Sequence, residues 1–62
     1  MEIEVEWRST ASGLTQIDIT DLGCKNKTEW RNLSQEEQRK RINIWQIENE
    51  PMEFKQIDWY EI

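Results

Sequence analysis

The chain has 62 residues, of which 13 are acidic and 8 basic, with one cysteine and no histidine. This composition excludes an internal disulfide and a Cys/His metal site, and it removes the usual acid–base catalyst near pH 7. The net charge of −5 opposes direct binding to nucleic acid or to an anionic membrane. Four tryptophans, each able to bury ~150–250 Å², favour a small binding protein over an enzyme. We therefore expect no catalytic residues, no cofactor and no metal.

The first 20 residues predict a β-hairpin. Apolar and charged residues alternate from Glu2 to Arg8, and alternation resumes from Thr15 to Thr20. A period of two is typical of half-buried strands. The small polar residues 9–13 predict the turn, in which Gly13 can adopt a positive φ. The apolar face of this hairpin is expected to consist of Ile3, Val5, Trp7, Ile17 and Ile19.

Residues 21–33 are typical of a connector between the hairpin and a helix. We expect Trp30 and Leu33 to pack against the core, and Thr28 to cap a short turn around Trp30.

A capping box marks the start of the predicted helix. The Ser34 hydroxyl can accept from the backbone N–H of Glu37, whose side chain can reach back to the N–H of Ser34. Pro51 sets the downstream limit, because proline disfavours helical geometry at the residue before it. We predict a helix over residues 34–49. Residues 41–47 also alternate in polarity, so a strand in that stretch is the competing prediction.

Residues 53–62 predict a final strand, with Tyr60 on the face opposite to Ile57 and Trp59. The element order indicates one domain over residues 1–62 of the α+β class. Its expected architecture is ββαβ, an antiparallel sheet with one helix packed across it.

Acidic residues on the first strand are the first candidate binding site. Glu2, Glu4 and Glu6 share one face at ~6.6–7 Å spacing, and Asp18 can join them from the second strand. A row of carboxylates at this pitch resembles the phosphates of a nucleic-acid strand, so it can bind a basic protein surface. The alternative is a solvated face whose charge prevents aggregation. Tyr60 is a further candidate, because tyrosine is enriched at binding hot spots.

Two isoleucines on the predicted helix form a second candidate site. Ile44 and Ile47 lie within ~60° of each other, on roughly the opposite side from Ile42 and Trp45. A helix on a small sheet needs only one apolar stripe. The second pair is expected to be covered by the connector or by another chain, including a second copy in a homodimer.

The run from Trp30 to Gln38, followed by Trp45 and an acidic end containing tryptophan, resembles many short proteins of tailed bacteriophages. Their shared pattern is a strand pair, a W-x-x-L-S-x-E-E helix start and a final strand. The resemblance implies a ββαβ or related fold and a protein that binds and blocks or redirects a host protein, including enzymes of antiviral defence. No functional residue carries over from it.

These observations together predict a non-enzymatic, phage-encoded protein that inhibits or redirects a host or defence protein by stoichiometric binding. The alternative is a structural protein that acts through homo-oligomerisation. The single Cys24, the absence of a secretory signal and the absence of a long apolar run predict a cytoplasmic protein. The resemblance to phage proteins implies that this is the cytoplasm of a bacterial host.

Overall fold

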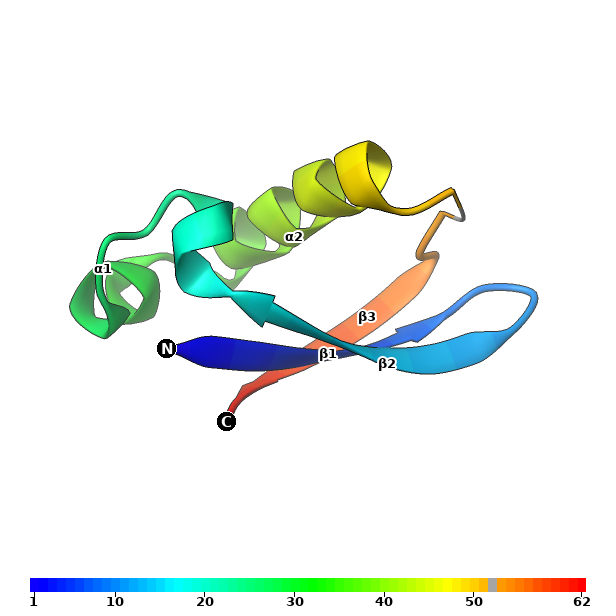
Figure 1. The fold of residues 1–62 in the computed structure, drawn as a ribbon, viewed down its shortest axis with the longest axis horizontal. Coiled ribbons are helices and arrows are strands. Elements are labelled where there is room, and N and C mark those ends of the chain that lie inside the picture. Colours follow the sequence, from blue (N-terminus) through cyan, green and yellow to red (C-terminus); the bar gives the residue numbers. More distant parts are fainter. Residues whose placement is uncertain (52) are drawn as a thin grey trace.

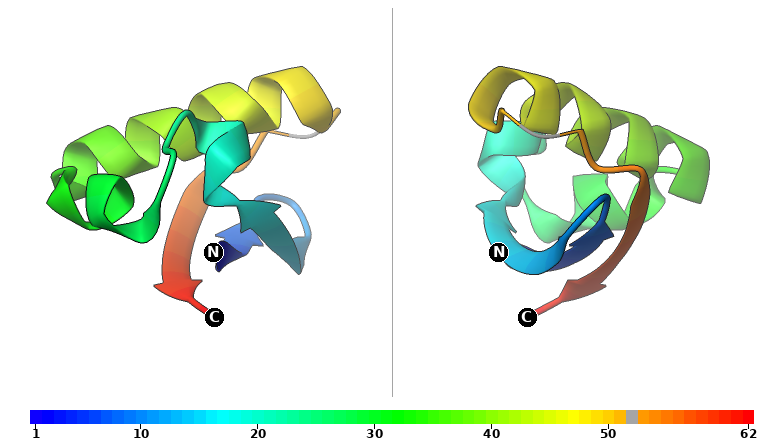
Figure 2. Two further views of the ribbon diagram at one scale, coloured as in Figure 1. Left: turned by 60° about the vertical axis from the view of Figure 1, so that its left-hand side comes forward. Right: turned by 90° about the vertical axis from the view of Figure 1, so that its right-hand side faces the viewer.

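The computed structural model describes residues 1–51 and 53–62. A three-stranded antiparallel sheet of order β2-β1-β3 carries the helix α2 across one of its faces (Figures 1 and 2). The predicted α+β class and the packing of one main helix on an antiparallel sheet are confirmed. In chain order the elements are β1 (Glu2–Arg8), β2 (Ser12–Asp18), the 3₁₀ helix η1 (Ile19–Leu22), α1 (Lys27–Asn32), α2 (Gln35–Asn49) and β3 (Gln56–Glu61).

The core lies between the sheet and the helical layer. Strand β1 is in the centre of the sheet, so its inward residues have neighbours on both sides. Val5 faces Thr15 on β2 and Trp59 on β3, and it is fully buried. The helical layer contributes Trp30 and Ile42, as predicted for Trp30. The buried apolar residues are Ile3, Val5, Ile17, Ile19, Leu22, Cys24, Trp30, Ile42, Phe54 and Ile57.

The second strand begins at Ser12, inside the predicted turn, and ends two residues before the predicted end at Thr20. Strand β2 ends at Asp18, because the Asp18 carboxylate accepts from the backbone N–H of Thr20 at 3.0 Å and starts η1. Ile19 is still buried, but it reaches the core from η1. The expectation of a positive φ at Gly13 is wrong; Gly23, which ends η1, has a φ of 82°.

Gly13 is required for a close approach. A Cβ atom at this position would lie 2.5 Å from Cζ2 of Trp7, its cross-strand neighbour. The Trp7 ring stacks on Phe54 with a centroid distance of 4.8 Å, and its Nε1 donates to the Thr15 hydroxyl at 3.1 Å. The indole is therefore held on several sides and cannot move away freely.

Replacing Gly13→Ala is expected to lower the free energy of unfolding by about 1–3 kcal/mol, because the added methyl group overlaps an immobilised ring. Urea denaturation followed by circular dichroism measures the change. Ser12→Ala, an exposed position one residue earlier, is the control and should leave the stability within about 0.5 kcal/mol. Equal stability of the two variants would contradict this account of the glycine.

The connector contains a helix, α1, that begins one residue after Asn26. The Asn26 side chain accepts from the N–H of Glu29 at 3.0 Å, so the cap is Asn26, and the prediction of Thr28 is wrong. Trp30 on α1 is buried and Leu33 packs against the core, as predicted.

Helix α2 confirms the predicted helix and excludes the competing strand over residues 41–47. The Ser34 hydroxyl accepts from the N–H of Glu37 at 3.1 Å, which is the expected cap. The Glu37 carboxylate points along the helix to Arg41, with an Oε1–Nε distance of 3.4 Å. The reciprocal half of the capping box is therefore replaced by an ion pair between residues four apart.

The final strand, β3, begins at Gln56, three residues later than predicted. The Phe54 side chain lies in the core before the strand starts, stacked on Trp7. This contact holds the segment that follows α2 against Trp7 of strand β1.

Candidate protein-binding surfaces

The face of the sheet that points away from α2 carries five carboxylates around one tyrosine. Because β1 is central, its outward side chains form the middle row, and those of β2 and β3 flank them. Asp58 on β3 belongs to this group but was not predicted, since its position depends on which strand lies beside β1. We call this surface the acidic face, and it consists of Glu2, Glu4, Glu6, Asp18, Asp58 and Tyr60.

The strand register sets like charges against each other on the acidic face. Glu2 is directly opposite Asp18, and Glu6 is directly opposite Asp58. Like charges in such positions destabilise a sheet. Within the described residues the one ion pair on this face joins Arg8 to Glu6 at 3.8 Å, and both side chains are exposed. The face therefore keeps a strong negative potential.

Asp18 has a structural function as well. Its carboxylate accepts from the backbone N–H of Thr20 at 3.0 Å and from the Thr20 hydroxyl at 2.9 Å. These hydrogen bonds hold the pKa of Asp18 below its ordinary value of 3.8. Asp18 is thus charged at neutral pH, but part of its bonding capacity is already used to cap η1.

Tyr60 lies beside Glu4 in the register and is 54% exposed. Desolvation raises the pKa of Tyr60, and the negative charges of Glu6, Asp58 and Glu4 raise it further against a smaller effect of Arg8. The phenol is therefore neutral at physiological pH, with its hydroxyl able to donate and its ring accessible. The sequence-based prediction that Tyr60 faces outward is confirmed.

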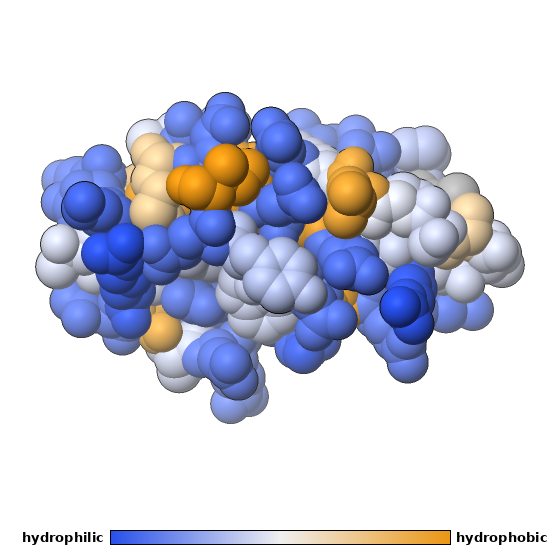
Figure 3. All heavy atoms as spheres, turned by 90° about the horizontal axis from the view of Figure 1, so that it is seen from below, coloured by the Kyte–Doolittle hydropathy of each residue, from blue (hydrophilic) through white to orange (hydrophobic). Residues whose placement is uncertain are grey.

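Figure 3 shows this side of the molecule as mostly hydrophilic, with separate hydrophobic spots. Two exposed apolar side chains border the acidic residues: Leu14 is opposite Glu6, and Ile62 follows β3, where its N–H donates to the Glu2 carbonyl at 3.1 Å. Single apolar groups among charges are ordinary on a protein surface, so Leu14 and Ile62 do not form an apolar patch on the acidic face.

The second candidate site lies on the other side of the molecule. Ile44 is 49% exposed and Ile47 is 73% exposed on the outer surface of α2. The connector leaves both isoleucines exposed, since Trp30 and Leu33 pack inward on the core and Leu22 is itself buried beside Ile44. The structure thus brings Glu2, Glu4, Glu6, Asp18 and Tyr60 together on the sheet, and places Ile44 and Ile47 apart from them.

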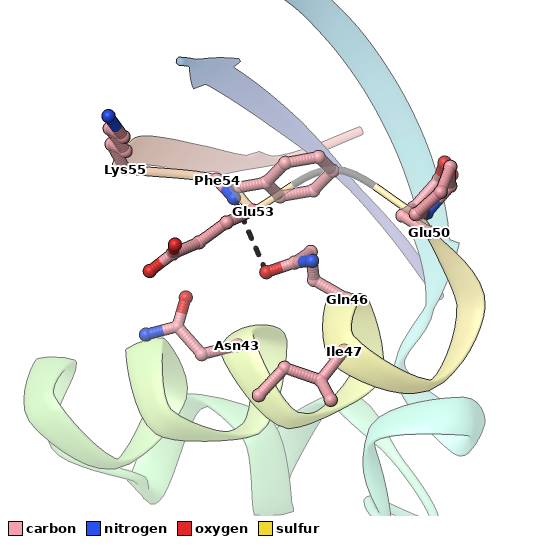
Figure 4. A pocket seen from close by; sticks show the side chains of 8 residues that line it. Asn43, Gln46, Ile47, Glu50, Glu53, Phe54 and Lys55 are labelled. Carbon is pink, nitrogen blue, oxygen red and sulfur yellow. Dashed lines mark hydrogen bonds between the residues drawn. The ribbon is translucent and has the colours of Figure 1, made fainter.

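A hollow of about 780 Å³ lies between the end of α2 and the segment before β3 (Figure 4). Its floor is Gln46, whose buried side-chain oxygen accepts from the Phe54 N–H at 3.3 Å. Gln46 was not predicted to be buried, although it follows Ile42 by four residues and therefore shares its side of the helix. Its hydrogen bond fastens the returning chain to α2, which gives Gln46 a structural function.

Comparison with known proteins finds no match: no family model, no curated protein and no solved structure corresponds to this chain. None of the helices in residues 1–51 and 53–62 has the length and apolarity needed to cross a membrane. The same residues contain no cluster of three or more acidic or cysteine side chains arranged to hold a metal ion.

Proposed function

We propose that this protein is a non-enzymatic, phage-encoded binding protein that inhibits or redirects a host or defence protein by stoichiometric binding. The observation that carries the proposal is the acidic face, where Glu2 opposes Asp18 and Glu6 opposes Asp58 around an exposed tyrosine. A fold that needed only solubility has no reason to place like charges directly opposite each other, because this arrangement costs stability. A basic partner would remove that cost on binding.

The partner is expected to present a basic surface. Side chains two residues apart on β1 repeat at ~6.6–7 Å, so the row of three glutamates can follow a groove that normally holds a phosphate backbone. The negative potential would also steer a basic partner toward this face and speed association. Tyr60, at the centre, can stack on an arginine guanidinium while the adjacent carboxylates accept its N–H groups. The proposed phage origin follows from the resemblance to short phage proteins. The bacterial host cytoplasm as the site of action follows from that origin together with the composition of the chain.

The second candidate function is a structural protein that acts through homo-oligomerisation. The exposure of Ile44 and Ile47 favours it, because side chains three residues apart are neighbours on a helix surface and can pack together against a second chain. This function would use the opposite surface and leave the acidic face free.

The test of the proposed function is affinity capture from bacterial lysate with the protein as bait. We expect the wild type to retain one protein at a fixed ratio, and the variant Glu2→Lys/Glu4→Lys/Glu6→Lys to retain it at least ~100-fold more weakly. The matched control reverses three exposed acids elsewhere, Asp21, Glu36 and Glu53, so that the net charge changes equally. Equal loss in both triple variants would show that net charge alone matters, and full retention by the first would exclude the acidic face as the binding site.

A further inference from the structure

The outer surface of α2 has a short stripe of three neighbouring side chains. At 100° per residue, Lys40, Ile44 and Ile47 fall within ~60° of each other. The buried Ile42 and Gln46 lie on the opposite side of the helix, so the stripe points straight away from the core. We call these three residues the outer stripe.

The charges on α2 agree with the dipole of the helix at its start, where Glu36 and Glu37 lie, but not at its end. Its last turn has no basic residue and contains Glu48, near the negative end of the dipole. The basic residues stand in the first half, and two of them are occupied: Arg39 lies over the Trp59 ring at 5.3 Å, and Arg41 pairs with Glu37 and donates to the Leu22 carbonyl at 3.1 Å. Within residues 1–51 and 53–62, neither Lys40 nor Glu48 forms an ion pair.

We propose that the outer stripe binds a second copy of this chain, with the two α2 helices antiparallel about a twofold axis beside Ile44. Lys40 and Glu48 each lie four residues from Ile44, which is about 6 Å along the helix at 1.5 Å per residue. The twofold axis therefore places Lys40 level with Glu48 of the second copy, and the pair occurs twice. Ile44 meets its own counterpart, and the two Ile47 side chains flank that contact.

Charge complementarity selects this arrangement. A parallel pair would bring Lys40 against Lys40 and Glu48 against Glu48, whereas the antiparallel pair joins opposite charges and opposes the two helix dipoles. The shape of the surface also fits an antiparallel helix pair, because the Ile44 side chain stands between two shallow hollows. One hollow is lined by Asn43 and Ile47 and the other by Leu22 and Trp45, and each can receive an isoleucine of the second copy.

The expected dimer is weak. Contact through one 15-residue helix buries less than the roughly 1,200–2,000 Å² of a standard stable interface. We expect dissociation constants between about 10 μM and about 1 mM. Both acidic faces remain exposed on the outside of the dimer, so self-association and the proposed function use separate surfaces and can fail separately.

The test is sedimentation equilibrium across protein concentrations from about 10 μM to about 1 mM, a range that brackets the expected dissociation constants. The wild type should shift from the mass of one chain toward the mass of two. Lys40→Glu and Glu48→Lys should each weaken dimerisation about tenfold, since either change puts like charges together twice. The double variant Lys40→Glu/Glu48→Lys restores opposite charges and should recover the wild-type affinity within about threefold.

Two controls identify the surface. Ile44→Asp should remain monomeric throughout while keeping its circular dichroism spectrum, because the side chain is already half exposed. Lys25→Glu and Glu2→Lys, single charge reversals away from α2, should leave dimerisation unchanged. A wild type that stays monomeric at the highest concentration, a charge-swapped variant that fails to recover, or a loss caused by Glu2→Lys would each overturn the proposal.

Discussion

Trp30→Ala is expected to leave most of the protein unfolded at 25 °C. Trp30 is the largest fully buried side chain, and removing a buried aromatic ring costs about 3–5 kcal/mol. A domain of 62 residues has a total free energy of unfolding of only about 3–9 kcal/mol. The cost is therefore comparable to the whole stability, and no disulfide or other cross-link within this chain offsets it.

Far-ultraviolet circular dichroism with a thermal melt measures this loss without relying on tryptophan fluorescence. Trp30→Phe is the matched variant, because it keeps an aromatic ring in the cavity and should retain a cooperative transition at a lower temperature. A native spectrum and an unchanged melting temperature for Trp30→Ala would mean that α1 is not part of the cooperative core.

Gln38→Ala is expected to lower the free energy of unfolding by about 1–3 kcal/mol, an effect well above that of an ordinary surface substitution. Gln38 joins three elements: its Nε2 donates to the Trp30 carbonyl at 2.8 Å, and its Oε1 accepts from Nε1 of Trp59 at 2.9 Å. Truncation removes both hydrogen bonds in a partly buried site: the Trp59 N–H loses its acceptor, while the Trp30 carbonyl keeps only the Leu33 N–H at 3.2 Å. A favourable change in helix propensity offsets little of that cost.

The control for Gln38→Ala is Gln35→Ala, the same substitution at an exposed position in the first turn of α2. Both variants make the same change of side chain on the same helix, so a lower urea midpoint for the Gln38 variant reports the lost hydrogen bonds. We expect the Gln35 variant to be at least as stable as the wild type. Equal midpoints would show that water replaces Gln38 at no cost.

The parts of the fold that follow from short-range chemistry could be predicted from the sequence. Alternation over residues 2–8 determined which side chains point inward, and the Ser34 cap located the start of α2. Helix ends at which two nearby residues can serve as the cap were harder to predict. Asn26 and Thr28 can both cap a helix, and the structure uses Asn26, whose side chain accepts from the N–H of Glu29.

Most of the candidate site was predictable, from the alternation within single strands and from the hairpin, which adds Asp18. Glu2, Glu4 and Glu6 share a face by the period of β1 alone. Asp58 joins them only because β3 pairs with β1 in a particular register, and a shift of one residue would turn its side chain inward. The burial of Gln46 was unpredictable for the same reason. A polar side chain is buried only where it has a hydrogen-bond partner, and the partner of Gln46 is the N–H of Phe54, eight residues away.

The central position of β1 has a consequence for how the molecule folds. This strand is made first, pairs with β2 through a tight turn, and then receives its second neighbour from residues 56–61. Closing so long a loop is slow compared with forming the hairpin or α2. Until the last strand docks, one edge of β1 offers free backbone groups beside apolar side chains, which is the state most exposed to pairing with other chains. We therefore expect the docking of β3 to limit aggregation during synthesis, and substitutions in that strand to change the yield of folded protein more than equal changes in β2.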